Sequence, residues 1–249
     1  MKKKIIISIC IVILVIAGFL GKKEIERARE AHENSHVEFA DKIMGQALCN
    51  AQWWRDDLTL ENVTYKELKK ITELNIGYIG YYDTIMDLQY CTDLTKIMIN
   101  YVSGEQDGAY FVNQGEVNRK VTKEEIENVQ QELSEILPKL KKIKWVTLTD
   151  FGDVQWTSID YMKNCDQIEL FEIDNCAATD YSVLKTCTSL KDIAIEHSDI
   201  SKAEDLIGLE HIESIEIYDT PLAENPEEIK KLKEAYPEAY IYYDKELEK

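Results

Sequence analysis

The chain has 249 residues, of which 45% are apolar and 31% are charged, enough apolar sequence for one medium-sized domain with a full core. A collagen, a coiled-coil rod, a small disulfide-stapled protein and a disordered chain are therefore excluded. Residues 24–249 carry 24 basic side chains against 47 acidic ones, a net charge of −23. Such a body repels phosphate backbones, so we expect no nucleic-acid partner.

The N-terminus has the pattern of an export or anchoring segment. Residues 5–20 form an uncharged run dominated by Ile, Val and Leu, with three lysines before it and two after it. As a helix, this run spans about 24 Å against a hydrocarbon core of about 30 Å, and the flanking lysines shorten the required span by snorkelling. We expect a single-pass anchor in the cell membrane, through residues 5–20, with an extracytoplasmic body. Cleavage near Ala17 is the alternative, and it gives a secreted protein.

One spacing of apolar residues recurs along the chain, at intervals of three, three, three and two. Its six copies begin at Tyr65, Leu88, Leu137, Met162, Leu184 and Leu206, and the last three copies start 22 residues apart. A fixed period in the twenties is typical of a solenoid, whose coils bury their apolar faces only against their neighbours. Intervals of three suit a turn of α- or 3₁₀-helix, and the final interval of two suits a short strand. The spacing therefore predicts a curved parallel sheet on the concave side and short helical turns on the convex side.

The last three apolar positions of four copies fit the motif L-x-x-L-x-L. They are Leu94/Ile97/Ile99, Ile168/Phe171/Ile173, Leu190/Ile193/Ile195 and Ile212/Ile215/Ile217. With these residues the chain resembles the leucine-rich repeat family in its 22-residue form, found in internalin-like bacterial surface proteins. At the family's turn asparagine this chain has Cys176, Ser198 and Thr220 instead, which weakens the usual side-chain ladder. The resemblance implies an α/β leucine-rich repeat solenoid with a helical N-cap, and a role in binding another macromolecule.

These signals divide the chain into seven parts. They are a signal-anchor or signal peptide at 1–23, a charged membrane-proximal stalk at 24–36, a helical N-cap at 37–64, the first leucine-rich repeats at 65–102, an irregular enlarged coil at 103–136, further leucine-rich repeats at 137–222 and a C-terminal cap at 223–249. Thr64 with Glu67, and Thr122 with Glu125, have the spacing of capping boxes at helix starts. In the enlarged coil, residues 110–121 suggest a hairpin and an amphipathic helix follows it. Residues 239–243 are predicted to form a closing strand.

Five cysteines lie outside the anchor segment, and three of them occupy one position of the repeat. Cys91, Cys165 and Cys187 stand where other copies have leucine, so we expect small core residues with free thiols. A disulfide between Cys165 and Cys187, on adjacent coils, is the alternative.

The side chains that flank the inward-pointing strand residues are predicted to face the concave surface. The candidate partner-binding residues on it are Met98, Trp145, Leu170, Glu172, Asp174, Asp192, Glu196, Glu216 and Tyr218. Like charges on neighbouring strands are unfavourable, so the crowding of acids suggests a docking surface for a protein or other macromolecule with basic groups. Trp145, Leu170 and Tyr218 are the candidate anchors. The alternative is the solvated face of an acidic, non-binding spacer of the cell envelope.

One catalytic motif occurs. His32-Glu33-Asn34-Ser35-His36 matches H-E-x-x-H, in which two imidazoles one helical turn apart hold zinc beside a catalytic carboxylate. Its setting is a charged stretch with no third ligand spaced nearby, so a zinc hydrolase using His32, Glu33 and His36 is the rival hypothesis. We expect no enzyme activity, no cofactor, no metal and no catalytic residue.

Overall fold

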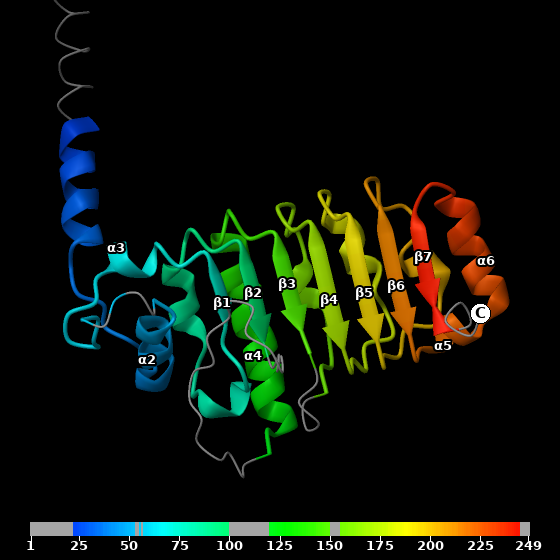
Figure 1. Cartoon of the computed structure of the whole chain (residues 1–249), viewed down its shortest axis with the longest axis horizontal. Coiled ribbons are helices and arrows are strands. Elements are labelled where there is room, and N and C mark those ends of the chain that lie inside the picture. Colours follow the sequence, from blue (N-terminus) through cyan, green and yellow to red (C-terminus); the bar gives the residue numbers. More distant parts are fainter. Residues whose placement is uncertain (1–21, 53–54, 56, 100–119, 150–154, 245–249) are drawn as a thin grey trace, which may run out of the picture.

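The computed structural model describes residues 22–52, 55, 57–99, 120–149 and 155–244. Within them one sheet of seven strands follows the order of the chain, and every neighbouring pair is parallel (Figure 1). The strands are β1 (Glu73–Asn75), β2 (Lys96–Ile99), β3 (Trp145–Leu148), β4 (Leu170–Asp174), β5 (Asp192–Glu196), β6 (Ser214–Tyr218) and β7 (Tyr240–Tyr243). Successive coils therefore stack in one direction, which confirms the parallel sheet that the spacing predicts.

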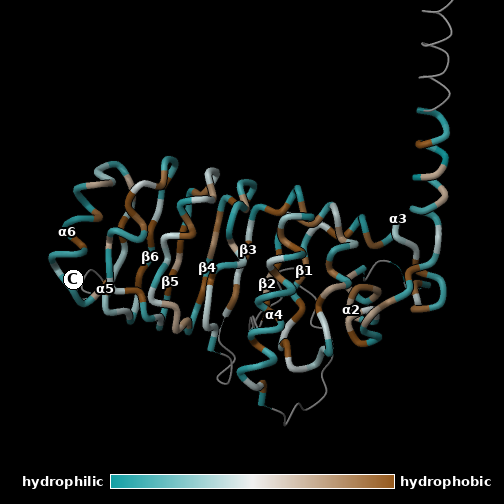
Figure 2. Tube along the Cα trace, turned by 180° about the vertical axis from the view of Figure 1, so that it is seen from behind, coloured by the Kyte–Doolittle hydropathy of each residue, from teal (hydrophilic) through white to brown (hydrophobic). Residues whose placement is uncertain are grey.

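The apolar residues of the repeat form a continuous spine behind the sheet. One row of direct cross-strand partners is Leu74, Ile97, Val146, Phe171, Ile193, Ile215 and Ile241, all of them buried. Hydrophobic segments accordingly recur from coil to coil along the trace (Figure 2). Burying one such side chain is worth about 1.5–3 kcal/mol, so the spine is the main stabilising feature of the stack.

Short helical turns precede most of the strands and form a second layer behind the sheet (Figure 1). They are η2 (Met86–Tyr90), η3 (Leu137–Lys139), η4 (Asp160–Met162), η5 (Ser182–Thr186) and η6 (Ala203–Asp205), and η1 (Ile79–Tyr81) follows β1. Helix α4 (Lys123–Ile136) enlarges the coil between β2 and β3. Thr122 caps it as predicted, because its hydroxyl accepts from the Glu125 N–H and the Glu125 carboxylate accepts from the Thr122 N–H. The hairpin suggested at 110–121 falls almost wholly outside the described residues.

Other helices lie at the two ends of the sheet. The N-terminal end has α2 (Lys42–Asn50), capped by Asp41, and α3 (Tyr65–Leu68), capped by the Thr64 hydroxyl. The C-terminal end has α5 (Pro221–Glu224), α6 (Pro226–Ala235) and the closing strand β7, which lies where the sequence predicts it. The predicted anchor segment, residues 5–20, lies outside the described residues. In the part of the chain that is described, no helix combines the length and apolar character needed to cross a membrane.

The five described cysteines are buried and free. Burial raises the pKa of the Cys165 thiol to about 12 and that of the Cys187 thiol to about 11, so both stay protonated at neutral pH. Cys187 Sγ lies 3.1 Å from the Met162 carbonyl oxygen, to which it donates. The expectation of free core thiols is confirmed, and the Cys165–Cys187 disulfide is not formed.

The turn that follows each strand repeats a backbone conformation. Asn175, His197 and Asp219 come directly after β4, β5 and β6 and have φ of 55°, 46° and 48°. Asn and Asp tolerate this left-handed region better than most residues, which makes His197 the unusual member. The next position in each turn is asparagine in the leucine-rich repeat family that the chain resembles. Here it holds Cys176, Ser198 and Thr220. Ser198 accepts from the Cys176 N–H and donates to the Glu196 carbonyl, so a side-chain link between these coils is retained.

Candidate functional site

The open face of the sheet, the face predicted to be concave, presents side chains in rows that run across the strands. The central row is Asn75, Met98, Thr147, Glu172, Ala194, Glu216 and Tyr242. A second row contains the residues two positions earlier on each strand. It is Glu73, Lys96, Trp145, Leu170, Asp192, Ser214 and Tyr240. The register therefore places most of the predicted site residues on one continuous surface.

Four carboxylates surround Ala194 at the centre of β5. Glu172 and Glu216 are its direct neighbours on β4 and β6, while Asp192 and Glu196 precede and follow it by two residues on β5 itself. We call these four residues the carboxylate ring. Strands stand about 4.8 Å apart, so the two flanking glutamates start about 10 Å from each other with only a methyl group between them.

The ring encloses an open hollow of ≈ 350 Å³, whose floor is Ala194 and whose edges include Leu170 and Ser214. A larger residue at position 194 would fill this space. The hollow is thus a product of two sequence choices, a small residue in the centre and acids on every side.

Within the described part of the chain, the ring acids are not neutralised by ion pairs. None of the four carboxylates makes an ion pair with Lys or Arg among the described residues. Burial raises the pKa of Glu172, Asp192 and Glu196, and neighbouring acids raise it further, with Glu216 acting on Glu172 and Asp174 acting on Glu196. A cation placed in the hollow would favour the charged form of these three groups.

An aromatic side chain lies beside the ring on β3. The Trp145 indole N–H donates to the Thr147 hydroxyl over 2.8 Å, and that hydroxyl donates to the Glu172 carboxylate over 3.0 Å. The Lys96 ammonium lies 3.6 Å from the centre of the Trp145 ring. Trp145 is still 36% exposed, so it is held in place and remains available as an anchor beside the ring.

One predicted contact residue is not accessible. Met98 is 5% exposed, and its partners in the central row, Asn75 and Thr147, are buried as well. The expectation that Met98 faces a partner is therefore corrected, because this end of the row is covered whereas the ring end is open. Leu170, Asp174 and Tyr218 are partly buried and reach the surface.

Two tyrosines of the open face were not predicted as site residues. Tyr240 and Tyr242 of β7 are 68% and 40% exposed, and their rings stack with centroids 6.2 Å apart. They continue the rows of Ser214 and Glu216 by one more strand. Extending the alternation of outward residues into the predicted closing strand would have found them.

A second cluster lies at the carboxyl ends of β4 and β5. Asp174 pairs directly with Glu196 across the two strands, and His197 follows Glu196. The His197 imidazole lies between two carboxylates, with Nδ1 2.8 Å from Asp174 Oδ1 and Nε2 3.1 Å from Asp219 Oδ2. The hydrogen bond to Asp174 raises the pKa of His197.

The H-E-x-x-H residues do not converge. Helical structure covers residues 22–33 and ends before His36, which forms an isolated bridge with Thr64. The His32 ring stacks on Tyr65 with centroids 4.5 Å apart. Lys69 and Arg29 donate to Glu33 and lower its pKa. The geometry of a zinc peptidase is therefore not formed by His32, Glu33 and His36.

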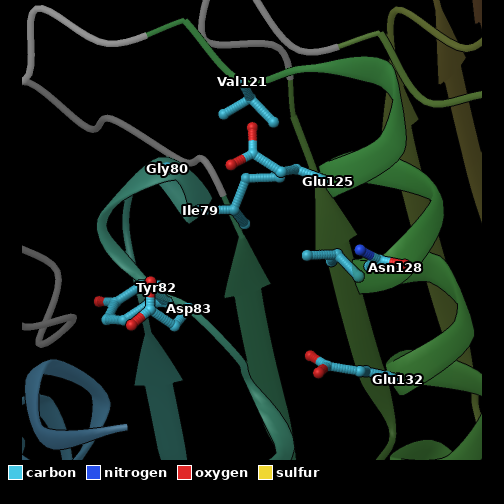
Figure 3. A pocket seen from close by; sticks show the side chains of 9 residues that line it. Ile79, Gly80, Tyr82, Asp83, Val121, Glu125, Asn128 and Glu132 are labelled. Carbon is cyan, nitrogen blue, oxygen red and sulfur yellow. The ribbon is translucent and has the colours of Figure 1, made fainter.

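A smaller hollow of ≈ 100 Å³ lies between α4 and the segment that follows β1. Figure 3 shows Glu125, Asn128 and Glu132 of α4 on one side of it and Tyr82 and Asp83 on the other. The Glu132 carboxylate accepts from the Thr84 hydroxyl and from the Ile85 N–H, which ties α4 to the first coil. We assign this hollow a structural role.

The chain was also compared with known protein families, curated proteins and solved structures. No protein-family model matches the chain, and no curated protein matches it. Among solved structures, an internalin from Listeria monocytogenes is 15% identical, with a TM-score of 0.45 over 82% of this chain and 55% of that one. The internalin C2 of the same organism is 16% identical, with a TM-score of 0.45 over 82% of this chain and 83% of that one. The chain thus spans about half the length of the first of these leucine-rich repeat proteins, and the fold assignment rests on the strand order and register described above.

Proposed function

We propose that this protein binds a macromolecular partner through the open face of its sheet and that the carboxylate ring receives a lysine or arginine side chain of that partner. The observation that carries the proposal is the ring itself, four acids around the Ala194 methyl group that form no ion pair with Lys or Arg among the described residues. Extended preformed surfaces of this kind suit protein recognition. Trp145 on one side, with Tyr218 and Tyr242 on the other, supplies the aromatic area that binding surfaces favour.

Charge reversal tests the ring. Fluorescent decapeptides of one length, one lysine-rich and one with serine in place of lysine, serve as defined probes in anisotropy titrations. The triple variant Glu172→Lys, Asp192→Lys and Glu216→Lys should lower affinity for the basic peptide by about tenfold or more, because each reversal replaces attraction by repulsion. Equal binding of the serine peptide by the unchanged protein would contradict the proposal.

A matched control separates the ring from general acidity. Glu124 and Glu135 of α4 and Glu227 of α6 are exposed acids on helices, not on the strands of the open face, and reversing all three changes the net charge by the same amount. This control should bind the basic peptide nearly as the unchanged protein does. The neutral variant Ala194→Leu fills the hollow, and it should weaken binding without altering any charge. Equal losses in both triple variants would show that only the overall charge matters and would leave the spacer as the better description.

We further propose a single-pass membrane anchor at residues 5–20 with the folded body outside the cytoplasm. The support is the apolar run and its flanking lysines. The chain should sediment with membranes, and protease added to intact spheroplasts should digest the body. Protection of the body from protease, or recovery of a shortened chain in the medium, would contradict this placement.

A further inference from the structure

The carboxyl ends of β4 and β5 carry a mixed set of nitrogen and oxygen donors. Asp174, Glu196 and His197 each bring one ligand atom within 4.8 Å of the other two, the single group of this kind within the described ranges. We propose that these three side chains bind a divalent transition-metal ion of the zinc type. The site adjoins the carboxylate ring and shares Glu196 with it.

The fold brings the three donors together. Direct pairing of Asp174 with Glu196 puts two carboxylates side by side on neighbouring strands, and both residues point to the open face. His197 stands at the left-handed turn position, where the backbone leaves the strand and returns its side chain to the acids. Around a tetrahedral zinc ion with bonds of about 2.0–2.1 Å, ligand atoms stand about 3.4 Å apart. The present separations therefore need only side-chain rotations of ordinary size to close on an ion.

The imidazole is held in an orientation that suits a ligand. Asp219, one coil further on, lies 3.1 Å from His197 Nε2. A carboxylate that accepts from one ring nitrogen fixes the tautomer and leaves the other nitrogen to the metal, an arrangement that recurs in metal sites. The other nitrogen, Nδ1, hydrogen-bonds Asp174 Oδ1 over 2.8 Å, and a metal ion bound there would take the place of the shared proton. Asp219 is thus a positioning residue, and the three ligands are Asp174, Glu196 and His197.

The donor set decides between metals. One imidazole with two carboxylates suits Zn²⁺ and similar ions, whereas Ca²⁺ takes six to eight oxygen ligands. An ion would also offset the repulsion between the carboxylates of Asp174 and Glu196, which pair directly across β4 and β5. His197 is exposed on the surface, so ions have direct access. Three protein ligands leave a fourth position for water or for a donor from a bound partner.

Titration of the full chain with Zn²⁺, followed by calorimetry, tests the site, and Co²⁺ gives a second readout through its visible absorption. We expect one ion per chain and a Co²⁺ spectrum of a four- or five-coordinate site. His197→Asn should weaken Zn²⁺ binding at least about tenfold and abolish the Co²⁺ bands, since it removes the nitrogen ligand. Asparagine is chosen because it tolerates the left-handed backbone at this turn. The exposed His211 gives the matched control, and His211→Asn should leave both signals unchanged.

Other results would overturn the proposal. Absence of stoichiometric Zn²⁺ binding would do so, and so would equal binding by His197→Asn, which would reduce the cluster to a surface acid patch. Glu196→Gln and Asp174→Asn should each lower the affinity for Zn²⁺, and full affinity in either would remove that residue from the site. His197→Asn leaves all four ring carboxylates in place, so peptide binding by this variant tests the carboxylate ring separately.

Discussion

Asp87 joins the first coil of the solenoid to the helix that precedes it. The side chain is buried, and its two oxygens accept from the Ala40 N–H over 3.1 Å and from the Asp41 N–H over 3.0 Å. Asp41 in turn caps α2, accepting from the N–H groups of Ile43 and Met44. Two buried carboxylates in succession thereby fix the N-cap against the sheet.

The charge state of Asp87 should make this junction sensitive to pH. Burial raises the pKa of Asp87, and the hydrogen bonds from Asp41 and Ala40 oppose that effect without cancelling it. The folded protein therefore binds this proton more readily than the unfolded chain does, so the group stabilises the fold fully below the unfolded pKa of about 3.9 and that contribution is lost as pH rises through the folded pKa.

Asp87→Asn removes the titration while keeping the size of the side chain. The free energy of unfolding, measured with urea from pH 4 to pH 7, should show a wild-type minus variant difference that falls as pH rises. Other titrating groups cancel in this difference. A difference that grows with pH would mean that the two amide hydrogen bonds outweigh burial.

Single polar residues such as Asp87 are beyond prediction from this sequence. It lies among 47 acidic side chains, and its burial depends on a helix 46 residues away in the chain. The carboxylate ring could be predicted in part, because the alternation of residues along each strand predicts that Glu172, Asp192 and Glu216 face outward. That they surround Ala194 required the register between coils, which the repeat spacing supplies only when the copies are compared position by position.

At the scale of elements, the strands were predictable because each one is set by two apolar residues at an interval of two. The helical turns before them follow from the intervals of three, and the capping box found α4 in a region where the repeat is lost. Such a cap contributes about 1 kcal/mol and marks the helix start in the sequence itself. The accessibility of Met98 was not predictable, since alternation gives the face of a side chain and not what covers it.

At the scale of the whole molecule, each strand of the described sheet pairs with the strands that precede and follow it in the chain. In such a stack, the free energy of unfolding is close to the sum of the intrinsic stabilities of the coils and the interaction energies between neighbouring coils. The apolar spine is continuous from Leu74 to Ile241. A truncated side chain in the middle of the spine should therefore destabilise the adjacent strands more than the distant ones. The same stacking places the carboxylate ring on three strands, which makes the proposed binding surface depend on the integrity of β4, β5 and β6.

Ile193→Ala tests this locality. Ile193 is buried between Phe171 and Ile215, and its truncation should cost about 2–5 kcal/mol. Hydrogen exchange followed by mass spectrometry should then show the largest loss of amide protection in β4, β5 and β6 and a smaller one in β1 and β2. Ser214→Ala, a neighbouring position that faces outward, serves as the control and should leave protection nearly unchanged. If protection falls equally in all seven strands, the described coils unfold as one cooperative unit, and the surface formed by β4, β5 and β6 owes its shape to the whole stack and not to its neighbouring coils alone.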